Sequence, residues 1–171
     1  MARVSRIVPV LALLLLTGAA APAPALTFPE VDHILVDKSA RTMTLYGVDG
    51  SVSVIADVQL GGAPTGPKRF EGDERTPEGR FTIDYGNPGS AYHLSLHIAY
   101  PRAEDTAFAQ AQGRSPGGLI FIHGQPNDWV GGGAGIRVPG DWTDGCIALS
   151  NDQIEALWDA VPDGTPIEIV G

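Results

Sequence analysis

The sequence predicts a mainly β domain, built as a curved sheet or sandwich with two short helices. Glycine and proline are abundant, with 22 and 14 residues spread along the 171-residue chain, and they divide it into short segments. Most of these segments alternate between apolar and polar residues, which is typical of strands with one buried face. Two further segments carry a pattern that favours a helix.

The first three predicted strands form a meander. The apolar run from His33 to Val36 ends at a polar turn, and the alternating run from Thr42 to Tyr46 follows it. Asp49-Gly50 is a strong β-hairpin signal, and Val52 to Val58 completes the hairpin. Antiparallel neighbours in chain order are the simplest arrangement of these three runs.

The middle of the chain combines a loop, two strands and a helix. Gly61 to Pro77 is a predicted loop, and Gly79 to Asp84 and Leu94 to Tyr100 are predicted strands. Ala103 to Gln112 is rich in alanine and is followed by Gly113, which predicts a helix that ends at this glycine.

A short apolar strand, Leu119 to Ile122, delivers His123 at its C-terminal end. The segment from Gly124 to Trp142 is a long glycine-rich loop, whose length would allow it to act as a lid.

The second predicted helix follows Ser150, which forms a capping box with Gln153. This helix carries its large apolar residues on one face, so we expect it to pack against the sheet. Pro166 to Val170 is the predicted closing strand.

Residues 1–25 are predicted to be a secretory signal peptide. Two arginines give it a positive start, the apolar run from Ile7 to Leu16 is short for a membrane span, and Ala23-Pro24-Ala25 supplies small residues for cleavage. We therefore expect residues 26–171 to form the mature domain, secreted to the periplasm or cell wall without a membrane anchor. An uncleaved N-terminal anchor is the alternative.

The charge balance argues against two classes of partner. Twenty aspartate and glutamate residues oppose eleven lysine and arginine residues, which gives a net charge of −9 at pH 7. Nucleic acid and anionic membrane surfaces are bound through basic patches. We therefore expect no nucleic-acid partner, and the sequence indicates no partner protein.

Cys146 is the single cysteine of the chain, so an exported domain carries it as a thiol without a disulfide partner. A thiol attacks an amide as the thiolate, and an imidazole takes the thiol proton and later protonates the leaving amine. His123 is the best candidate for that base, and the pair predicts a Cys/His acyl-transfer site. The alternative is a buried structural cysteine, because Gly-Cys-Ile-Ala-Leu is apolar enough for a core strand.

The residues beside this pair have predicted supporting roles. Gly124 leaves room for a substrate, or offers a carbonyl that orients the histidine ring. Gly145 permits a close backbone approach, so N–H groups from Asp144 to Cys146 are candidate donors to an oxyanion. Thr143 is expected to hold the turn through its hydroxyl.

Two other histidines, His93 and His97, have the spacing of zinc ligands on a helix. The alternation between them is that of a strand, which separates the rings by about 13 Å, too far for one zinc ion. We therefore expect no metal and no cofactor. His97 and Ser95 are instead candidates to line the substrate path, although an ordinary strand histidine is the alternative for His97.

Three neighbouring carboxylates, Asp73, Glu74 and Glu78, raise the possibility of a glycosidase. A glycosidase needs two carboxylates that face each other across a cleft. These three lie on one turn, so the sequence predicts a solvated loop instead.

Two blocks of the sequence resemble the catalytic domain of the L,D-transpeptidases (YkuD-type). One block is His123-Gly124, a glycine-rich loop and then Thr143-x-Gly-Cys-Ile147. The other, Gly72-Asp-Glu-Arg-Thr-Pro-Glu-Gly-Arg-Phe81, is similar to the family's Gly-Asp-x-x-Thr-Pro-x-Gly turn before a strand. The resemblance covers roughly residues 31–170 and implies a YkuD-like, mostly β fold with the cysteine and histidine at a cleft.

The resemblance also implies a reaction on peptidoglycan stem peptides. Cys146 would attack an amide, typically after a diaminopimelate residue, with His123 as the base and the Gly124 carbonyl orienting it. Gly145 and Cys146 would donate to the oxyanion. A thioester forms, the terminal residue leaves, and a second amine resolves the thioester. Water in that role would make the enzyme an L,D-amidase or carboxypeptidase.

Two positions depart from the family's usual Ser-His-Gly-Cys-Ile-Arg block. Asp144 stands where a second histidine is expected, and Ala148 stands where the arginine is expected. The charge of Asp144 would raise the pKa of a nearby thiol, and the missing arginine removes a carboxylate contact. The runs Ser95-Leu-His-Ile-Ala-Tyr-Pro101 and Asp141-Trp-Thr-x-Gly-Cys resemble a divergent branch of the family, in which some members look like hydrolases.

Three functions therefore stay open at this point. Transpeptidation and hydrolysis of stem peptides or protein–peptidoglycan links would use the same site. A non-catalytic wall-binding module is the third, although such a module has no need of an intact Cys/His pair.

Overall fold

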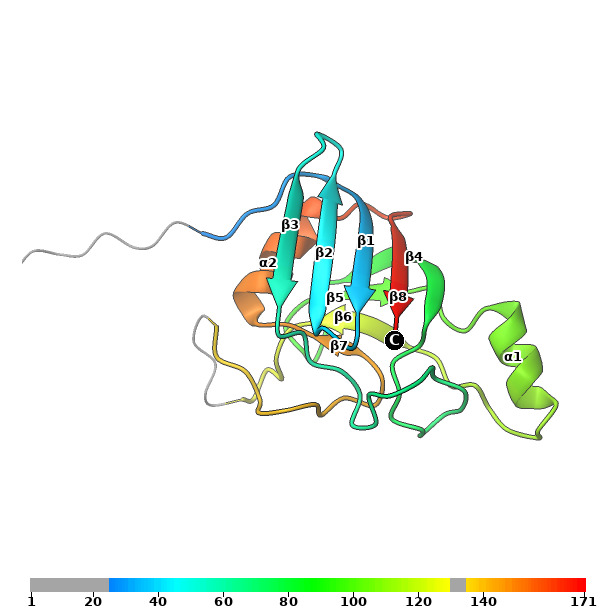
Figure 1. Ribbon diagram of the computed structural model, residues 1–171. Helices are drawn as coiled ribbons and strands as arrows, with labels where there is room; N and C mark the ends of the chain where they lie inside the picture. Colours follow the sequence, from blue (N-terminus) through cyan, green and yellow to red (C-terminus); the bar gives the residue numbers. More distant parts are fainter. Residues whose placement is uncertain (1–24, 130–134) are drawn as a thin grey trace, which may run out of the picture.

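The computed structural model describes residues 25–129 and 135–171. In this part of the chain, eight strands form one curled sheet in the order β3-β2-β1-β8-β4-β5-β6-β7, accompanied by two helices (Figure 1). The predicted mainly β class is confirmed. The elements are β1 (Val31–Asp37), β2 (Thr42–Gly47), β3 (Val52–Ala56), β4 (Gly79–Asn87), β5 (Ser95–Ile98), α1 (Ala103–Gln110), β6 (Ile120–His123), β7 (Ile147–Ala148), α2 (Asn151–Ala160) and β8 (Pro166–Val170).

The predicted signal peptide lies outside the described residues except for Ala25, and so does part of the glycine-rich loop. Over residues 25–129 and 135–171, no helix combines the length and the hydropathy that a membrane crossing requires.

The first three strands form the predicted meander. β2 pairs antiparallel with β1 and with β3, and its inward-facing residue Met43 is fully buried between them. Gly50 in the hairpin turn has φ of 82°, a conformation that glycine adopts without strain. β3 ends at Ala56 and not at Val58, because Asp57 has φ of 57° and turns the chain out of the sheet.

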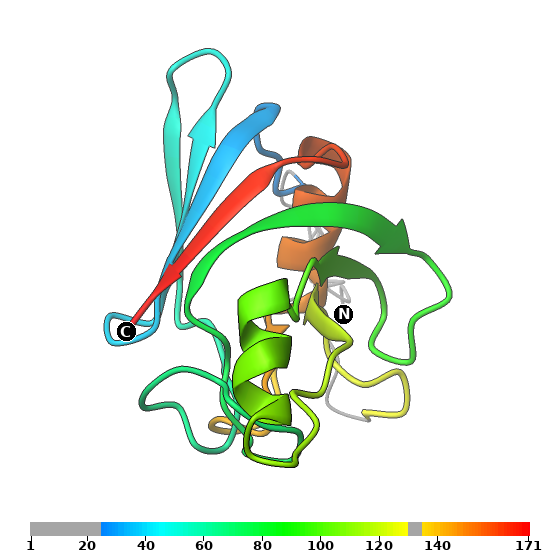
Figure 2. The same ribbon diagram turned by 90° about the vertical axis from the view of Figure 1, so that its right-hand side faces the viewer.

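β4 joins the two halves of the sheet and is longer than predicted. Its first residues, Gly79 to Thr82, pair with β8, and its later residues, Ile83 to Asn87, pair with β5. A register shift between Ile83 and Tyr85 marks the change of partner. Such irregularities bend and twist a strand, and Figure 2 shows β4 (green) arching away from β8 (red).

Helix α2 fills the inside of this curl. Gln153 accepts a hydrogen bond from the Ser150 N–H at 3.1 Å, as the predicted capping box requires. The Trp158 ring packs over Gly86 of β4, where an added Cβ would lie only 2.6 Å from the ring. The core consists of apolar side chains from the sheet, from α2 and from the segments next to them. Its largest fully buried members are Ile34, Met43, Leu60, Ile83, Ile98, Ile122, Ile147, Leu149, Ile154, Leu157, Ile167 and Ile169.

The far end of the sheet brings the two predicted site segments together. β6 ends at His123 and pairs in parallel with β7, with Ile122 opposite Ile147. Cys146 comes directly before β7. Two isolated bridges, Gln59 to Ala148 and Gly61 to Thr143, attach this segment to the chain that follows β3.

Candidate active site

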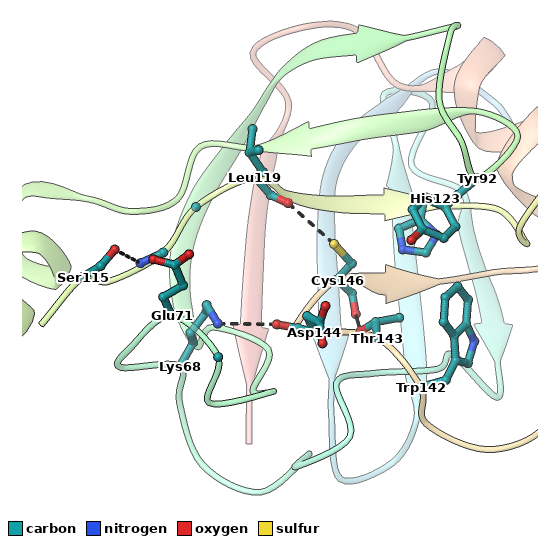
Figure 3. Close-up of a pocket in the computed structure, with 13 residues that line it drawn as sticks. Lys68, Glu71, Tyr92, Ser115, Leu119, His123, Trp142, Thr143, Asp144 and Cys146 are labelled. Atoms are coloured by element: carbon teal, nitrogen blue, oxygen red, sulfur yellow. Dashed lines mark hydrogen bonds between the residues drawn. The ribbon is translucent and has the colours of Figure 1, made fainter.

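Cys146 and His123 line one cavity together (Figure 3). They also line a second, smaller cavity that meets the first at these residues. The larger cavity has a volume of about 670 Å³ and the smaller about 300 Å³. Both are lined by the same four residues, Tyr92, Leu119, His123 and Cys146. The thiol is therefore accessible from two sides.

A tight turn presents Cys146. Gly145 has φ of 127°, and a Cβ on it would lie 2.5 Å from the Arg75 carbonyl oxygen, so this position requires glycine. The Thr143 hydroxyl accepts a hydrogen bond from the Gly145 N–H at 3.2 Å and donates one to the Cys146 carbonyl at 2.7 Å. Thr143 thus holds the turn, and the Gly145 N–H is already engaged by it.

The thiol lies against β6 and is not hydrogen bonded to the imidazole. The Phe121 N–H points to Sγ at 3.4 Å, and Sγ lies 3.7 Å from the Leu119 carbonyl oxygen. Leu119 has φ of 54°, a conformation that is strained for a leucine and is typical of functional sites.

Burial raises the pKa of the Cys146 thiol above its ordinary value. The Phe121 N–H and the charge of Lys68 lower this pKa, and the charge of Asp144 raises it, in the direction expected from the sequence. The upward direction of the pKa favours the neutral thiol as the resting form.

His123 is buried, and its tautomer follows from its partner. Its Nδ1 lies 2.7 Å from the Gly124 carbonyl oxygen, which accepts hydrogen bonds only, so Nδ1 carries the proton. Nε2 is then unprotonated and available to accept one. Burial lowers the pKa of His123, and the Gly124 carbonyl opposes this shift.

Aromatic rings fix the plane of this imidazole. Tyr92 stacks on it with ring centroids 4.7 Å apart, and Trp142 meets it edge-on at 5.6 Å. The two rings leave His123 little freedom to turn.

The surroundings of residue 124 leave no room for a side chain, so this position requires glycine. An added Cβ would lie 2.7 Å from Asn151 Oδ1 and 3.0 Å from both His93 Cβ and Ile154 Cγ2. Its N–H donates to the Tyr92 carbonyl at 3.0 Å, so Gly124 holds the turn before β5 that carries Tyr92 as well as the imidazole.

A buried pair of amides anchors the segment that leads to Trp142. Gln125 Nε2 donates to Gln59 Oε1 at 3.2 Å and to the Leu149 carbonyl at 2.6 Å. Gln59 Nε2 donates in turn to the carbonyls of Val138 and Gly140, both at 2.5 Å. The exit of the glycine-rich loop is therefore fixed from inside the protein.

Lys68 lies on the opposite side of the thiol and is almost completely buried. Its Nζ forms an ion pair with Asp73 Oδ1 at 2.9 Å and donates to the Asp144 carbonyl at 3.4 Å. Asp73 also accepts hydrogen bonds from the N–H groups of Arg69, Phe70 and Arg75. Burial opposes its ionisation, but these bonds hold its pKa below the ordinary value.

The expected solvated loop at Asp73 and Glu78 is thus wrong for both residues. Asp73 is the hub of the turn, and Glu78 pairs with the buried Lys38 at 2.8 Å. The reason is that loop 61–77 folds back onto the protein, so that these carboxylates receive lysine and backbone donors.

The other sequence candidates are divided by the structure. Ser95 lies opposite His123 in the β5–β6 register and lines the smaller cavity. His97 lines neither cavity: its Nδ1 contacts Asp84 at 2.6 Å, and its ring stacks on Tyr85.

The two remaining positions singled out in the sequence, His93 and Ala148, line neither cavity. His93 lies before β5 and contacts Glu155 at 2.7 Å. Within the described ranges, no group of three or more His, Cys, Asp or Glu side chains could hold a metal ion. Ala148 is fully buried on β7, so the family's arginine position adds no charge to the cavities.

Sequence reasoning missed Lys68, Tyr92 and Trp142 as parts of this site. Trp142 had a signal in its position beside Thr143, and Lys68 had one in its position close to the Gly72-Asp73 turn. Tyr92 had none, because only tertiary packing brings it over the imidazole.

Comparison with known proteins agrees with this geometry. Residues 31–169 match the family model described as YkuD, L,D-transpeptidase catalytic domain. The Escherichia coli K12 protein named as an L,D-transpeptidase, YafK, is 27% identical over 134 residues, which is 75% of this chain and 46% of that protein.

Solved structures show the same fold. The helical cell shape determining protein Pgp2 of Campylobacter jejuni superimposes with a TM-score of 0.62 and 27% identity, over 85% of this chain and 49% of Pgp2. Bd1075 of Bdellovibrio bacteriovorus gives a TM-score of 0.54 and 25% identity, over 82% of this chain and 48% of Bd1075. The chain spans about half the length of these relatives. On the family-model match, the chain belongs to the L,D-transpeptidase catalytic domain family.

Proposed function

We propose that the protein is a peptidoglycan L,D-transpeptidase that acts in the periplasm or cell wall through a thioester on Cys146. The observation that carries the proposal is the fixed tautomer of His123. Its Nδ1–H is held by the Gly124 carbonyl at 2.7 Å, which leaves Nε2 as a base in a site shared with the thiol. Family membership supports peptidoglycan as the substrate.

The first half-reaction forms the thioester. The thiol rotates away from β6 and gives its proton to His123 Nε2 as sulfur attacks the carbonyl carbon of the stem-peptide amide. The Cys146 N–H donates to the oxyanion, since the Gly145 N–H is engaged by Thr143. The C–N bond then breaks, and the proton on Nε2 passes to the leaving amine.

The second half-reaction releases the acyl group. An acceptor amine attacks the thioester carbonyl and gives its proton to His123 Nε2. The C–S bond breaks, and this proton returns to sulfur, which restores the neutral pair. The two cavities that meet at Cys146 support a reaction with separate donor and acceptor, because each can hold one substrate.

Hydrolysis is the competing outcome, and product analysis separates the two. The purified protein is incubated with disaccharide-tetrapeptides and with cross-linked sacculi, and the products are identified by mass spectrometry. Cross-linked dimers support transfer, whereas shortened stems or released monomers identify an amidase or carboxypeptidase. Absence of any product, together with absence of an acyl adduct on Cys146, would exclude both.

A further inference from the structure

The wall of the larger cavity continues into a stack of two arginines and two phenylalanines. The Arg69 guanidinium lies 4.8 Å from the Phe108 ring centroid, and that of Arg114 lies 3.7 Å from the Phe70 centroid. The two rings are 5.9 Å apart. We call these four residues the arginine stack; they join the loop before Asp73 to helix α1 and the segment after it.

The arginine stack is attached directly to the cavity. The Glu71 N–H donates to the Ser115 carbonyl at 2.9 Å, and both Glu71 and Ser115 line the cavity that holds Cys146 (Figure 3). Each is adjacent in sequence to a member of the stack, namely Phe70 and Arg114. A ligand that extends from the thiol past Ser115 therefore reaches the stack.

The two guanidinium groups have no carboxylate partner among the described residues, whereas Lys68 and Arg102 beside them do. Lys68 pairs with Asp73, and Arg102 pairs with Glu104 and Asp105. Arg69 and Arg114 are exposed and form no ion pair with any residue that the structure describes. In a chain with a net charge of −9, two free cations beside the cleft offer a distinct place for an anion.

Stacking prepares these groups for a carboxylate. A guanidinium that lies flat on a ring keeps its N–H edge directed outward, and its planar fork matches the two oxygens of a carboxylate. Because the rings already restrict the arginine side chains, binding loses less conformational freedom. Phe108 is 41% exposed and adds apolar surface for the aliphatic part of a ligand.

Chain geometry limits the size of the ligand. Five Cα–Cα steps separate Leu119, whose carbonyl touches the thiol, from Arg114, so their Cα atoms are at most about 19 Å apart. An extended peptide of about five residues covers this distance.

We infer that the arginine stack binds a carboxylate of the peptide substrate. This carboxylate belongs to the part of the peptide that extends from the thiol past Ser115, away from the amide that Cys146 attacks. This inference rests on the proposed function and adds a specificity site to it. Stem peptides provide the probe, since their glutamyl carboxyl group is obtainable free or as an amide.

The test measures binding by the full chain carrying Cys146→Ala, which removes turnover. We expect it to bind the free-acid peptide about tenfold more tightly than the amidated one, as for a charge-assisted hydrogen-bonded pair. Adding the double substitution Arg69→Gln/Arg114→Gln to this variant should weaken binding of the free-acid peptide but not of the amidated peptide. The preference for the free acid is then abolished. The pair Arg69→Lys/Arg114→Lys should keep part of it, because the charge remains and the planar fork is lost.

Arg80→Gln is the matched control, since Arg80 is an exposed arginine on β4, and it should leave both affinities unchanged. The inference would be overturned if the Cys146→Ala chain bound the two peptides with equal affinity. It would also be overturned if Arg69→Gln/Arg114→Gln lowered the affinity for both peptides equally. If the unsubstituted protein still converts both peptides, the proposed function survives that result. If neither peptide is bound or converted, both fail.

Discussion

The two sides of the cleft around Cys146 differ in charge. On one side, His123 and Gly124 are buried and the rings of Tyr92 and Trp142 are partly exposed, and none of these residues adds a charge. Ring stacking and a backbone carbonyl fix the imidazole there. On the other side of Cys146, Lys68, Glu71 and Asp144 line the same cavity (Figure 3), and Lys68 forms an ion pair with Asp73. Under the proposed function, proton transfer would take place on the uncharged side, and the charges on the other side would act on the thiol from a distance.

Removing the thiol itself gives the largest expected effect. Cys146→Ala should lower turnover by about 10³-fold or more, since the covalent step is lost. Turnover and the acyl adduct are followed by mass spectrometry, and circular dichroism checks the fold. Activity close to that of the unsubstituted protein would contradict the assignment of Cys146 as nucleophile.

Gly124→Ala tests the neutral side. The new methyl group must displace Asn151, His93 or Ile154, so we expect a destabilisation of about 1–3 kcal/mol and a loss of turnover. Because the Gly124 carbonyl raises the pKa of His123 against the effect of burial, displacing it should move the acid limb of kcat/KM to lower pH.

A purely structural role for Gly124 would leave that acid limb in place while activity fell. Gly89→Ala serves as the stability control, since its methyl group would meet nothing closer than Asn87 Oδ1 at 3.6 Å.

Lys68→Met tests the charged side. It leaves the Asp73 carboxylate partly buried without its lysine, and we expect a loss of about 3 kcal/mol in the free energy of unfolding. Arg80→Gln breaks the exposed pair with Glu168 and should cost less than about 1 kcal/mol. Denaturant titration of both variants makes the comparison, and equal losses would mean that the buried pair has no special weight.

Asp144→Asn should give the smallest change, and its direction is the informative part. The carboxylate raises the pKa of Cys146, so the variant should shift the pH midpoint of iodoacetamide alkylation downward. The same midpoint in the unsubstituted protein should lie above that of an ordinary thiol, because burial raises the pKa. Asp163→Asn, in an exposed turn distant in sequence, should leave it unchanged; an upward shift in Asp144→Asn would contradict the electrostatic account.

The sequence was sufficient where one local signal determined one local structure. The turn at Asp49-Gly50, the capping box at Ser150 and the apolar alternation of β1, β2 and β8 each depend on neighbouring residues, and all appear in the structure. The thiol and imidazole could be paired from their chemistry, since few other side chains perform that proton transfer.

The remaining parts of the site depend on residues that meet only in the folded chain. Tyr92 and Trp142 reach His123 from segments some 30 residues before it and 19 after it. Trp142 is at least next to the Thr143 block in the sequence, whereas nothing beside Tyr92 indicates its place over the imidazole. Gln59 and Gln125 are polar residues that would be placed at the surface on composition alone, yet they are buried as a mutually bonded pair. Asp73 was misjudged for the same reason, because its donors are supplied by the folding of the loop.

The position of β8 has a consequence for how the protein forms. This strand follows every other strand along the chain, but it lies in the middle of the sheet, parallel to β1 and antiparallel to β4. The two halves of the sheet are therefore joined only after residues 166–170 have found their places. Contacts between such distant segments make folding slow. In the periplasm or cell wall, where the proposed function places the protein, the single cysteine would be exposed to oxidants throughout that interval. Its oxidation would compete most strongly with folding before β8 is in place.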